Sequence, residues 1–225
     1  MKTTILFLSF IFTLSSCSNA ANDNPVSNGG STDGLQTVRI DANQTDPAIQ
    51  SNSIAYFASG CFWCVEAVFE SVIGVGDVIS GYSGGKASDA KYELVSAGRT
   101  NHAEAVAVHY DSTKIDYTTL LKVFFGSQDP TTLNQQGPDR GKQYRSSIFY
   151  RNAKEKDLSE QYVAELLKQG TFSKITTEIV PFEAFYAAED YHQNYEHKNP
   201  DNGYVKAVSV PRLNKFKAKF PELLK

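Results

Sequence analysis

Cysteine is scarce in this chain of 225 residues, where only Cys17, Cys61 and Cys64 are present. Small exported domains that are stapled by disulfides need a larger, usually even set of cysteines, so such a framework is excluded. A hydrophobic core must therefore stabilise the fold, and 14 Phe and 12 Tyr can supply its aromatic part.

An excess of positive charge and internal repeats are also missing. Lys and Arg number 22 against 25 Asp and Glu, which gives a formal net charge of −3. Nucleic-acid binders carry basic surfaces that neutralise phosphates, so this balance argues against a general nucleic-acid binder.

Long apolar runs are absent as well. The stretch from Ile5 to Leu14 has ten residues, whereas a helix that spans a bilayer needs about 20. Because the stretch follows a single cation, Lys2, and precedes small residues, it indicates a secretory signal and an exported protein.

The end of this stretch, Leu14-Ser15-Ser16-Cys17, resembles the bacterial lipobox, in which the cysteine is lipidated. We interpret residues 1–17 as a lipoprotein signal peptide and expect a membrane-anchored protein of the bacterial cell envelope that faces the periplasm. Ordinary cleavage near Ala20 or Ala21, with loss of Cys17, is the alternative.

Two regions follow. Residues 18–53 are rich in Asn, Ser, Gly, Asp and Thr and bury too little apolar surface to fold, which predicts a flexible tether. Residues 54–225 are the length of one domain, and we expect it to be monomeric.

Strand and helix patterns alternate in this domain. Strand patterns occur at 54–58, 76–82, 104–110, 145–150 and 176–180, and helix patterns at 62–71, 89–97, 116–126 and 153–169. Asp116 and Asn152 are predicted N-caps, and Gly126 and Gly170 predicted terminators. The alternation favours an α/β (α+β) fold, with a mixed sheet, a split βαβ arrangement and flanking helices.

Two further segments stand out. Residues 127–143 are irregular and contain several Gly and Pro, and a loop of this length inside a domain indicates a functional loop. Near the end of the chain, Pro211 can begin a short helix that Pro221 ends.

The most informative motif is Gly60-Cys61-Phe62-Trp63-Cys64, which joins a predicted strand to a predicted helix. Cys61 would lie at the helix N-terminus, where free N–H groups and the helix dipole favour a thiolate and lower the thiol pKa. Cys64 lies one turn further on, close enough for a disulfide after modest rearrangement. The motif predicts a redox-active site, the alternative being two buried structural cysteines.

Three more patches carry polar groups at strand ends: Tyr82 in 81–85, Glu104 in 101–108 and Tyr144 in 143–147. Together with the cysteine motif they resemble the A type of peptide methionine sulfoxide reductase, which acts on the S epimer at sulfur. The resemblance also covers 129–132, 134–147, 177–179, 188–195 and 197–200.

This resemblance implies a ferredoxin-like βαβ core, and reduction of methionine sulfoxide, in proteins and free, through a Cys61 sulfenic acid. It implies no bound cofactor and an external thiol reductant, a thioredoxin-like protein or dithiothreitol. Cys61 would be the nucleophile, and Phe62 and Trp63 the apolar cup for the substrate methyl group. The polar wall around the sulfoxide oxygen would comprise Tyr82, Glu104, Asp139 and Tyr144.

Physical chemistry supports these roles. The sulfoxide oxygen needs a proton to leave, and a carboxyl such as Glu104 that is buried among aromatic rings has a raised pKa and can provide one. Cys61 sulfenic acid would then condense with a neighbouring thiol to a disulfide.

The chain departs from the family pattern in two places. Many members carry resolving cysteines in the C-terminal tail, but none follows Gly203 here, so Cys64 is the one candidate within this chain. Gln128 stands where the family commonly has His.

Three other functions would use parts of the same sequence. Cys61, Cys64 and His102 could bind zinc with Glu104 as acid–base, but their order is the reverse of that in zinc deaminases, so we expect no metal. A thioredoxin-like lipoprotein that uses Cys-x-x-Cys alone would leave Glu104 and the tyrosines unexplained. A purely binding lipoprotein would not depend on Cys61.

Overall fold

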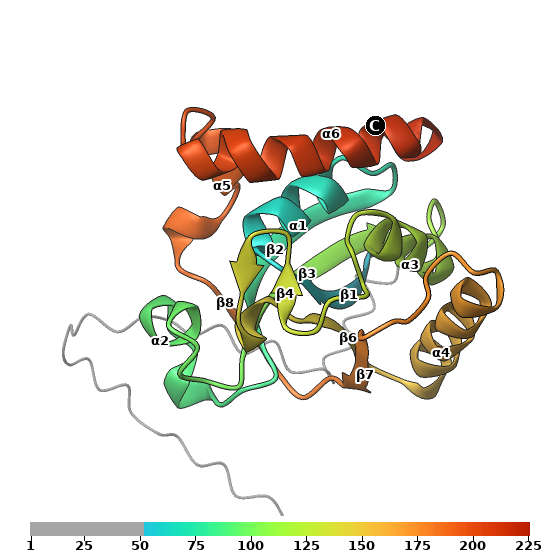
Figure 1. Ribbon diagram of the computed structural model, residues 1–225, viewed down its shortest axis with the longest axis horizontal. Coiled ribbons are helices and arrows are strands. Elements are labelled where there is room, and N and C mark those ends of the chain that lie inside the picture. Colours follow the sequence, from blue (N-terminus) through green and yellow to red (C-terminus); the bar gives the residue numbers. More distant parts are fainter. Residues whose placement is uncertain (1–51) are drawn as a thin grey trace, which may run out of the picture. The chain divides into compact units, whose positions relative to one another are not determined.

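The computed structural model describes residues 52–225 (Figure 1). The expected signal peptide 1–17, the lipidation site Cys17 and nearly all of the tether 18–53 lie outside the described residues. Asn52 and Ser53, which we expected in the tether, are instead the first residues of strand β1, Asn52–Ser59. Within the described part of the chain, no helix has the length and apolar character needed to cross a bilayer.

One six-stranded sheet organises the domain. Besides β1 it contains β2 (Val75–Ser83), β3 (Ala103–Asp111), β6 (Ser146–Tyr150), β7 (Glu178–Pro181) and β8 (Phe185–Ala187). The strand order is β7-β6-β1-β3-β2-β8, and the β6–β7 pair alone is parallel. The expected mixed sheet is thereby confirmed.

The central four strands form the expected split βαβ core. Helix α1 (Phe62–Glu70) connects β1 to β2, and helix α3 (Tyr117–Gly126) connects β3 to the segment that leads to β6. The order β6-β1-β3-β2, antiparallel throughout, is that of a ferredoxin-like fold. In the register, Tyr82 of β2 pairs with Glu104 of β3.

Aromatic packing holds α1 and α3 against the sheet. The ring of Phe57 on β1 stacks between Phe69 of α1, at 5.3 Å, and Phe124 of α3, at 5.1 Å. All three side chains are fully buried, and offset aromatic pairs add to the energy of burying their area. This packing fixes the position of α1, whose N-terminus carries the two cysteines.

The predicted helix caps are present. The Asp116 side chain accepts a hydrogen bond from the N–H of Thr119 at 2.7 Å, and that of Asn152 accepts one from the N–H of Glu155 at 3.0 Å. Helix α4 (Ala153–Lys168) therefore begins where its cap predicts.

Several boundaries differ from the prediction. The helix expected at 89–97 is a 3-10 turn, Ala87–Asp89, followed by α2, Tyr92–Ser96. Strand β8 and the hairpin of β4 (Gln135–Gln136) with β5 (Asp139–Arg140) were missed. These strands have two or three residues, too few for a period of two to appear in the sequence.

The C-terminal helix begins earlier than expected. Helix α6 (Val210–Lys219) continues directly from a π-helical turn, Val205–Ser209. Pro211 has no N–H to donate to the preceding turn, which favours a widened turn at that point. Before it lies α5 (Tyr195–Lys198), and Figure 1 shows α6 lying across α1.

Candidate active site

The turn between β1 and α1 is built for close packing. Gly60 has φ +84°, and a Cβ at this position would approach Gln136 to 2.6 Å, so only glycine fits. Arg212 of α6 holds the residue before it, donating to the Ser59 carbonyl at 2.9 Å and to Ser59 Oγ at 3.0 Å. Cys61 then becomes the N-cap of α1.

The two thiols lie together below the surface. Cys61 and Cys64 are both free, with 7% and 2% of their surface exposed. Burial raises the pKa of Cys61 well above its usual value, helped by a hydrogen bond to Cys64 and by the nearby Glu104. The pKa of Cys64 is lowered to about 6, chiefly because it accepts that hydrogen bond from Cys61.

These pKa shifts correct the expectation that Cys61 would have the lowered pKa. The N–H of Trp63 does favour a Cys61 thiolate, as the helix N-terminus predicts, but burial outweighs it.

Glu104 provides a buried acid beside Cys61. It lies on β3 with 2% of its surface exposed, and its Oε2 accepts the Phe62 N–H at 3.1 Å. Burial raises its pKa to about 8, partly offset by the Phe62 hydrogen bond. The carboxyl is therefore protonated at neutral pH, in the state that the sequence analysis expected of a proton donor.

Tyr82 does not take the place expected for it in the polar wall. Its hydroxyl donates to Glu189 at 2.8 Å, and the other oxygen of Glu189 accepts the N–H of Tyr92 at 3.0 Å. Although burial opposes it, these hydrogen bonds lower the pKa of Glu189. Tyr82 thus supports the segment that carries Tyr92 rather than presenting a free hydroxyl.

Tyr92 and Tyr144 lie near the Cys61–Glu104 pair, because both Glu104 and Cys61 act on the pKa of each tyrosine. Burial raises the pKa of Tyr92 to about 12, and Glu104 and Cys61 add to the rise. Burial likewise raises the pKa of Tyr144, with contributions from Glu104, Asp139 and Cys61. Tyr92 could not be recognised from the sequence, because a tyrosine that starts a short helix is an ordinary packing residue until its neighbours are known.

Phe62 and Trp63 do form an aromatic cluster. The Phe62 ring, almost fully buried, lies 5.0 Å from the His192 ring and 6.3 Å from the Trp63 ring. Trp63 stacks on Tyr195 at 3.7 Å, and its Nε1 donates to His192 Nδ1 at 3.1 Å. The hydrogen bond and stacking fix the indole in one orientation.

Asp139 lies in the loop that we expected to be functional, on β5. Its Oδ2 accepts the Tyr204 hydroxyl at 2.6 Å, and that hydroxyl is 3.9 Å from Cys64 Sγ. Burial raises the pKa of Asp139, whereas the Tyr204 hydrogen bond and Arg212 act against the rise. Gln128 lines the same cavity as Cys64, and its Oε1 accepts a long hydrogen bond of 3.5 Å from Gln136.

The zinc alternative does not fit the geometry. His102 directs its Nε2 to the Lys86 carbonyl at 3.0 Å and to Asp89 at 3.2 Å, rather than toward the cysteines. Among residues 52–225, no group of three His, Cys, Asp or Glu side chains is arranged to bind a metal ion.

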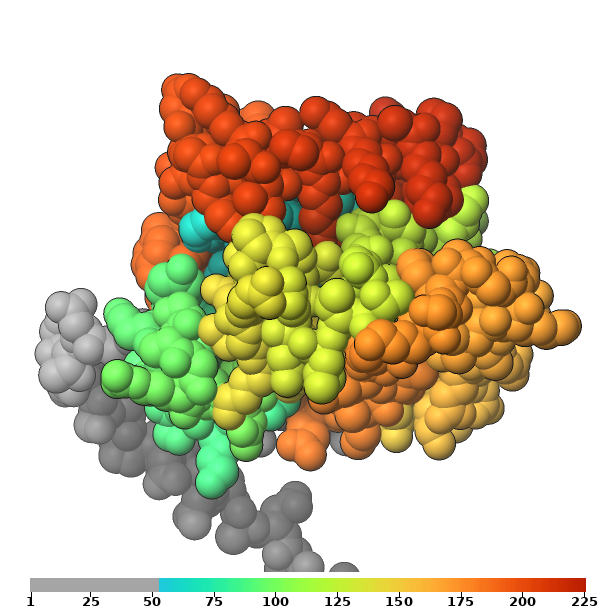
Figure 2. All heavy atoms as spheres, in the orientation of Figure 1, coloured from blue at the N-terminus to red at the C-terminus, as the bar shows by residue number. Residues whose placement is uncertain are grey.

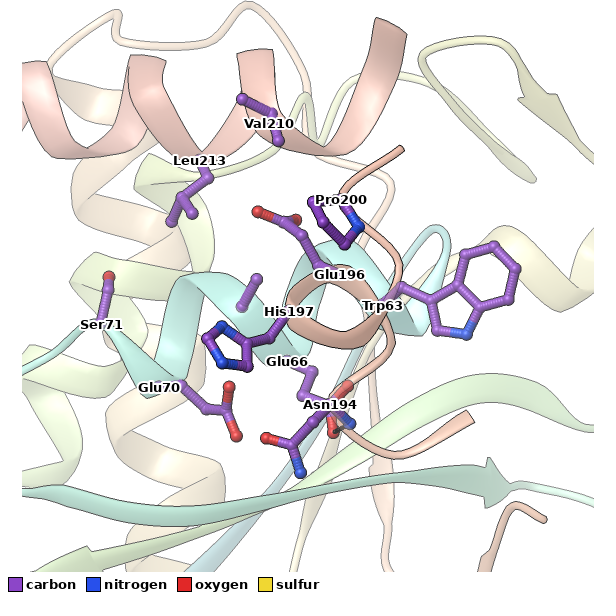
Figure 3. A pocket seen from close by; sticks show the side chains of 11 residues that line it. Trp63, Glu66, Glu70, Ser71, Asn194, Glu196, His197, Pro200, Val210 and Leu213 are labelled. Atoms are coloured by element: carbon purple, nitrogen blue, oxygen red, sulfur yellow. Dashed lines mark hydrogen bonds between the residues drawn. The ribbon is translucent and has the colours of Figure 1, made fainter. Parts of the chain in front are cut away.

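A cavity of about 410 Å³ lies behind Trp63, between α1, α5 and α6 (Figure 3). Glu66, Glu70 and Glu196 line it. Glu66 is buried, accepts the Asn194 N–H at 2.9 Å, and has its pKa raised to about 7 by burial. Figure 3 shows the indole of Trp63 apart from these carboxyl groups. We interpret this cavity as a gap left where α5 packs against α1.

A buried thiol pair at a helix N-terminus, next to a protonated carboxyl and two tyrosine hydroxyls, defines a thiol-dependent oxidoreductase. Residues 53–224 match the family model described as peptide methionine sulfoxide reductase. The chain belongs to this family, and it is an oxidoreductase that reduces methionine sulfoxide.

Individual relatives agree with this assignment. The chain is 48% identical over 172 residues to peptide methionine sulfoxide reductase MsrA of Pasteurella multocida, covering 76% of this chain and 98% of that protein. MsrA of Picrophilus torridus is 44% identical over 167 residues, or 74% and 94% of the two chains.

Solved structures of similar fold include Mxr1 of Saccharomyces cerevisiae in reduced form. Its TM-score is 0.63 at 34% identity, over 70% of this chain and 90% of that one. Methionine sulfoxide reductase A of Corynebacterium diphtheriae has a TM-score of 0.59 at 35% identity, over 68% and 77%.

Proposed function

We propose that the domain reduces the S epimer of methionine sulfoxide, in proteins and free, with Cys61 as the nucleophile and Cys64 as the resolving thiol. The observation that carries this proposal is the placement of Cys61 between two partners. On one side is Cys64, one helical turn away, whose backbone N–H donates to the Cys61 carbonyl at 3.2 Å. On the other is Glu104, which is protonated at neutral pH because burial raises its pKa to about 8.

The first step transfers oxygen. The Cys61 thiolate attacks the sulfoxide, a proton from Glu104 passes to the oxygen, and the products are methionine and Cys61 sulfenic acid. Tyr92 and Tyr144 orient the oxygen without adding charge, since burial raises both their pKa values. Phe62 and Trp63 contact the substrate methyl group.

The second step closes a disulfide. Cys64 attacks the Cys61 sulfur, the S–S bond forms as the S–O bond of the sulfenic acid breaks, and the leaving hydroxyl takes up a proton from solvent and departs as water. The Cys61 thiol, which chiefly lowers the pKa of Cys64, is consumed in the first step, but Arg212 and the hydroxyls of Ser209 and Tyr204 also lower that pKa and favour the nucleophilic thiolate. A dithiol, such as a thioredoxin-like protein or dithiothreitol, then returns two electrons, and no bound cofactor is required.

Separate epimers of a methionine sulfoxide peptide test the substrate assignment. With dithiothreitol as reductant, residues 52–225 should convert the S epimer to methionine and leave the R epimer unchanged, as measured by chromatography. Equal conversion of both epimers, or conversion of the R epimer alone, would overturn the proposed stereochemistry.

We further propose that the domain acts in the cell envelope, tethered through a lipidated Cys17, and repairs oxidised exported proteins. The support is the sequence Leu14-Ser15-Ser16-Cys17 after a short apolar stretch. Two acyl chains anchor a protein stably where a single chain binds reversibly. In cells given labelled palmitate, the full chain should take up label and Cys17→Ala should not. An unlabelled wild-type protein in the soluble exported fraction would instead indicate ordinary signal cleavage.

A further inference from the structure

One buried carboxyl on α1 has no part in the proposed mechanism. Glu66 lies one turn beyond Phe62 and Trp63, and 1% of its surface is exposed. Its Oε1 accepts the N–H of Asn194 at 2.9 Å. Its second oxygen, Oε2, is buried and has no partner with hydrogen-bond geometry among residues 52–225. Burying a half-satisfied carboxyl costs free energy, so this position needs a physical explanation.

The residue that Glu66 holds lies directly before α5. Asn194 has φ +55°, a left-handed conformation that costs free energy and persists where surrounding contacts hold it. In Figure 2 a part of α1, in cyan, is visible between the red C-terminal segment and the orange-red residues that lead into α5. The hydrogen bond from Asn194 to Glu66 therefore ties the start of α5 to α1.

The first residue of α5 is in contact with the substrate cup. The ring of Tyr195 stacks on the Trp63 indole, with 3.7 Å between ring centroids and 7° between the ring planes. The two residues before Asn194 are held as well. Gln193 donates to the Ser80 carbonyl at 3.0 Å, and His192 accepts the Trp63 Nε1–H at 3.1 Å. Burial lowers the pKa of His192, so neither of these two contacts changes its charge at neutral pH.

The Glu66 contact does change its charge there. Burial raises the pKa of Glu66 to about 7, and Glu70 on the same helix adds to the rise. The N–H groups of Asn194 and Tyr195 and the nearby Ser80 hydroxyl of β2 act against the rise. Glu66 is therefore ionised above pH 7 and protonated below it.

Other charged groups surround this carboxyl. Those that line the same cavity are Glu70 of α1 and Glu196 and His197 of α5, whereas the α6 residues that line it, Val210 and Leu213, are uncharged. Asp77 of β2 and the C-terminal Lys225 act on Glu70. The Asn194 N–H bonds to Glu66, however, so the charge of Glu66 is the one that acts directly on the start of α5.

A carboxylate holds an N–H group more firmly than a neutral carboxyl does. Hydrogen bonds to an ionised acceptor are roughly twice as strong as those between neutral groups. Protonation of Glu66 therefore weakens its hold on Asn194, and the ring of Tyr195 loses part of the support that keeps it against Trp63.

Resting on the proposed function, in which Trp63 contacts the substrate methyl group, we propose that Glu66 is a positioning residue for substrate binding. Its carboxylate fixes Asn194, and thereby the Tyr195 ring against Trp63, so the affinity for methionine sulfoxide falls when this carboxyl takes up a proton. Glu66 acts through α5 and not by touching the substrate, since Figure 3 shows the Trp63 indole directed away from Glu66 and Asn194.

Trp63 is the single tryptophan of the chain, so intrinsic fluorescence reports on the cup alone. In the reduced wild-type protein without substrate, we expect a fluorescence change with a midpoint near pH 7. Glu66→Gln should lack this step, because an amide accepts the Asn194 N–H without titrating. The step from Cys64, near pH 6, should remain in every protein.

Glu70→Gln is the matched control, because Glu70 lies one turn further along α1 and lines the same cavity. This variant should keep the step near pH 7, at a slightly lower midpoint, since Glu70 adds to the raised pKa of Glu66. A step of wild-type size in Glu66→Gln, or its loss from both variants, would overturn the proposal.

Kinetics separate substrate binding from chemistry. Binding that is equal in the ground state and the transition state changes the half-saturating concentration and not the maximal rate. In single-turnover assays at pH 8, Glu66→Ala should raise the half-saturating concentration of methionine sulfoxide about threefold to tenfold and leave the maximal rate within about twofold. Glu66→Gln, which keeps an acceptor and the shape of the side chain, should show a smaller rise.

The pH dependence of binding completes the test. Between pH 8 and pH 6 the half-saturating concentration should increase for the wild type and for Glu70→Gln, but not for Glu66→Gln. A lower maximal rate with an unchanged half-saturating concentration in the Glu66 variants would contradict the positioning role.

The two hypotheses fail separately. The fluorescence titration involves no substrate, so it tests the link between Glu66 and Trp63 even if the substrate assignment is wrong. Conversely, conversion of the S epimer by the wild type can be measured whatever the pH dependence of the fluorescence.

Discussion

Cys61→Ser should abolish reduction of methionine sulfoxide, while Cys64→Ser should retain one turnover. A serine hydroxyl at position 61 is too weak a nucleophile in this buried site to accept the sulfoxide oxygen. Without Cys64 the oxygen can still transfer, but the sulfenic acid has no thiol partner within the domain. We expect about one methionine per enzyme from Cys64→Ser in the absence of reductant, and none from Cys61→Ser.

The measurement is a quenched single-turnover assay, with a sulfenic-acid probe such as dimedone added after the reaction. Cys64→Ser should be labelled at Cys61, whereas wild-type enzyme should form the disulfide and escape labelling. If both variants lose the first turnover equally, the division between nucleophile and resolving thiol is wrong.

The second large effect is expected when the buried acid Glu104 is replaced. Glu104→Gln should lower the single-turnover rate by about 10²–10⁴ at pH 7, the usual contribution of a positioned general acid. The wild-type rate should rise with pH through about 6, as the thiol pair ionises, and fall through about 8, as Glu104 loses its proton. The glutamine variant should lack the fall on the alkaline side.

Stability provides the accompanying control. A carboxyl whose pKa is raised from 4.5 to about 8 by folding contributes stability below pH 4.5 that is lost as the pH rises through 8. At pH 7 this loss is on the order of 3 kcal/mol for an almost fully buried group. Between pH 5 and pH 8 the wild type should therefore lose more stability than Glu104→Gln does.

Glu93→Gln, an exposed change on α2, should alter neither the rate nor this dependence of stability on pH. A Glu104→Gln variant with wild-type rate at pH 7 would remove Glu104 from the mechanism. A variant with the low rate but with a wild-type pH dependence of unfolding would show that Glu104 is ionised in the folded protein.

Local features of the chain could be predicted because they depend on neighbours in sequence. Asp116 and Asn152 cap their helices through residues only three positions away. The order of strands and helices followed from apolar periodicity, and the split βαβ core follows from that order because its connections are right-handed and short. The position of Cys61 at a helix N-terminus could likewise be predicted, because it depends on residues close to it in the sequence.

Tertiary structure decided the properties that depend on distant residues. Whether Tyr82 or Tyr92 faces the acid depends on Glu189, which is 107 residues beyond Tyr82 in the chain. The pKa values of the thiols could not be predicted from the helix dipole, because burial outweighs it for Cys61. Arg212 and Tyr204 reach the thiol pair from a segment that shows no catalytic motif.

The sequence by itself thus determined the chemistry available here: two thiols, one carboxyl and the helix that starts between the cysteines. Only the folded chain decided which thiol has the raised pKa and which tyrosine hydroxyl is bonded to Glu189. The reason is physical, since pKa values and access depend on desolvation and on neighbours in space, and these are set by packing between segments far apart in the sequence.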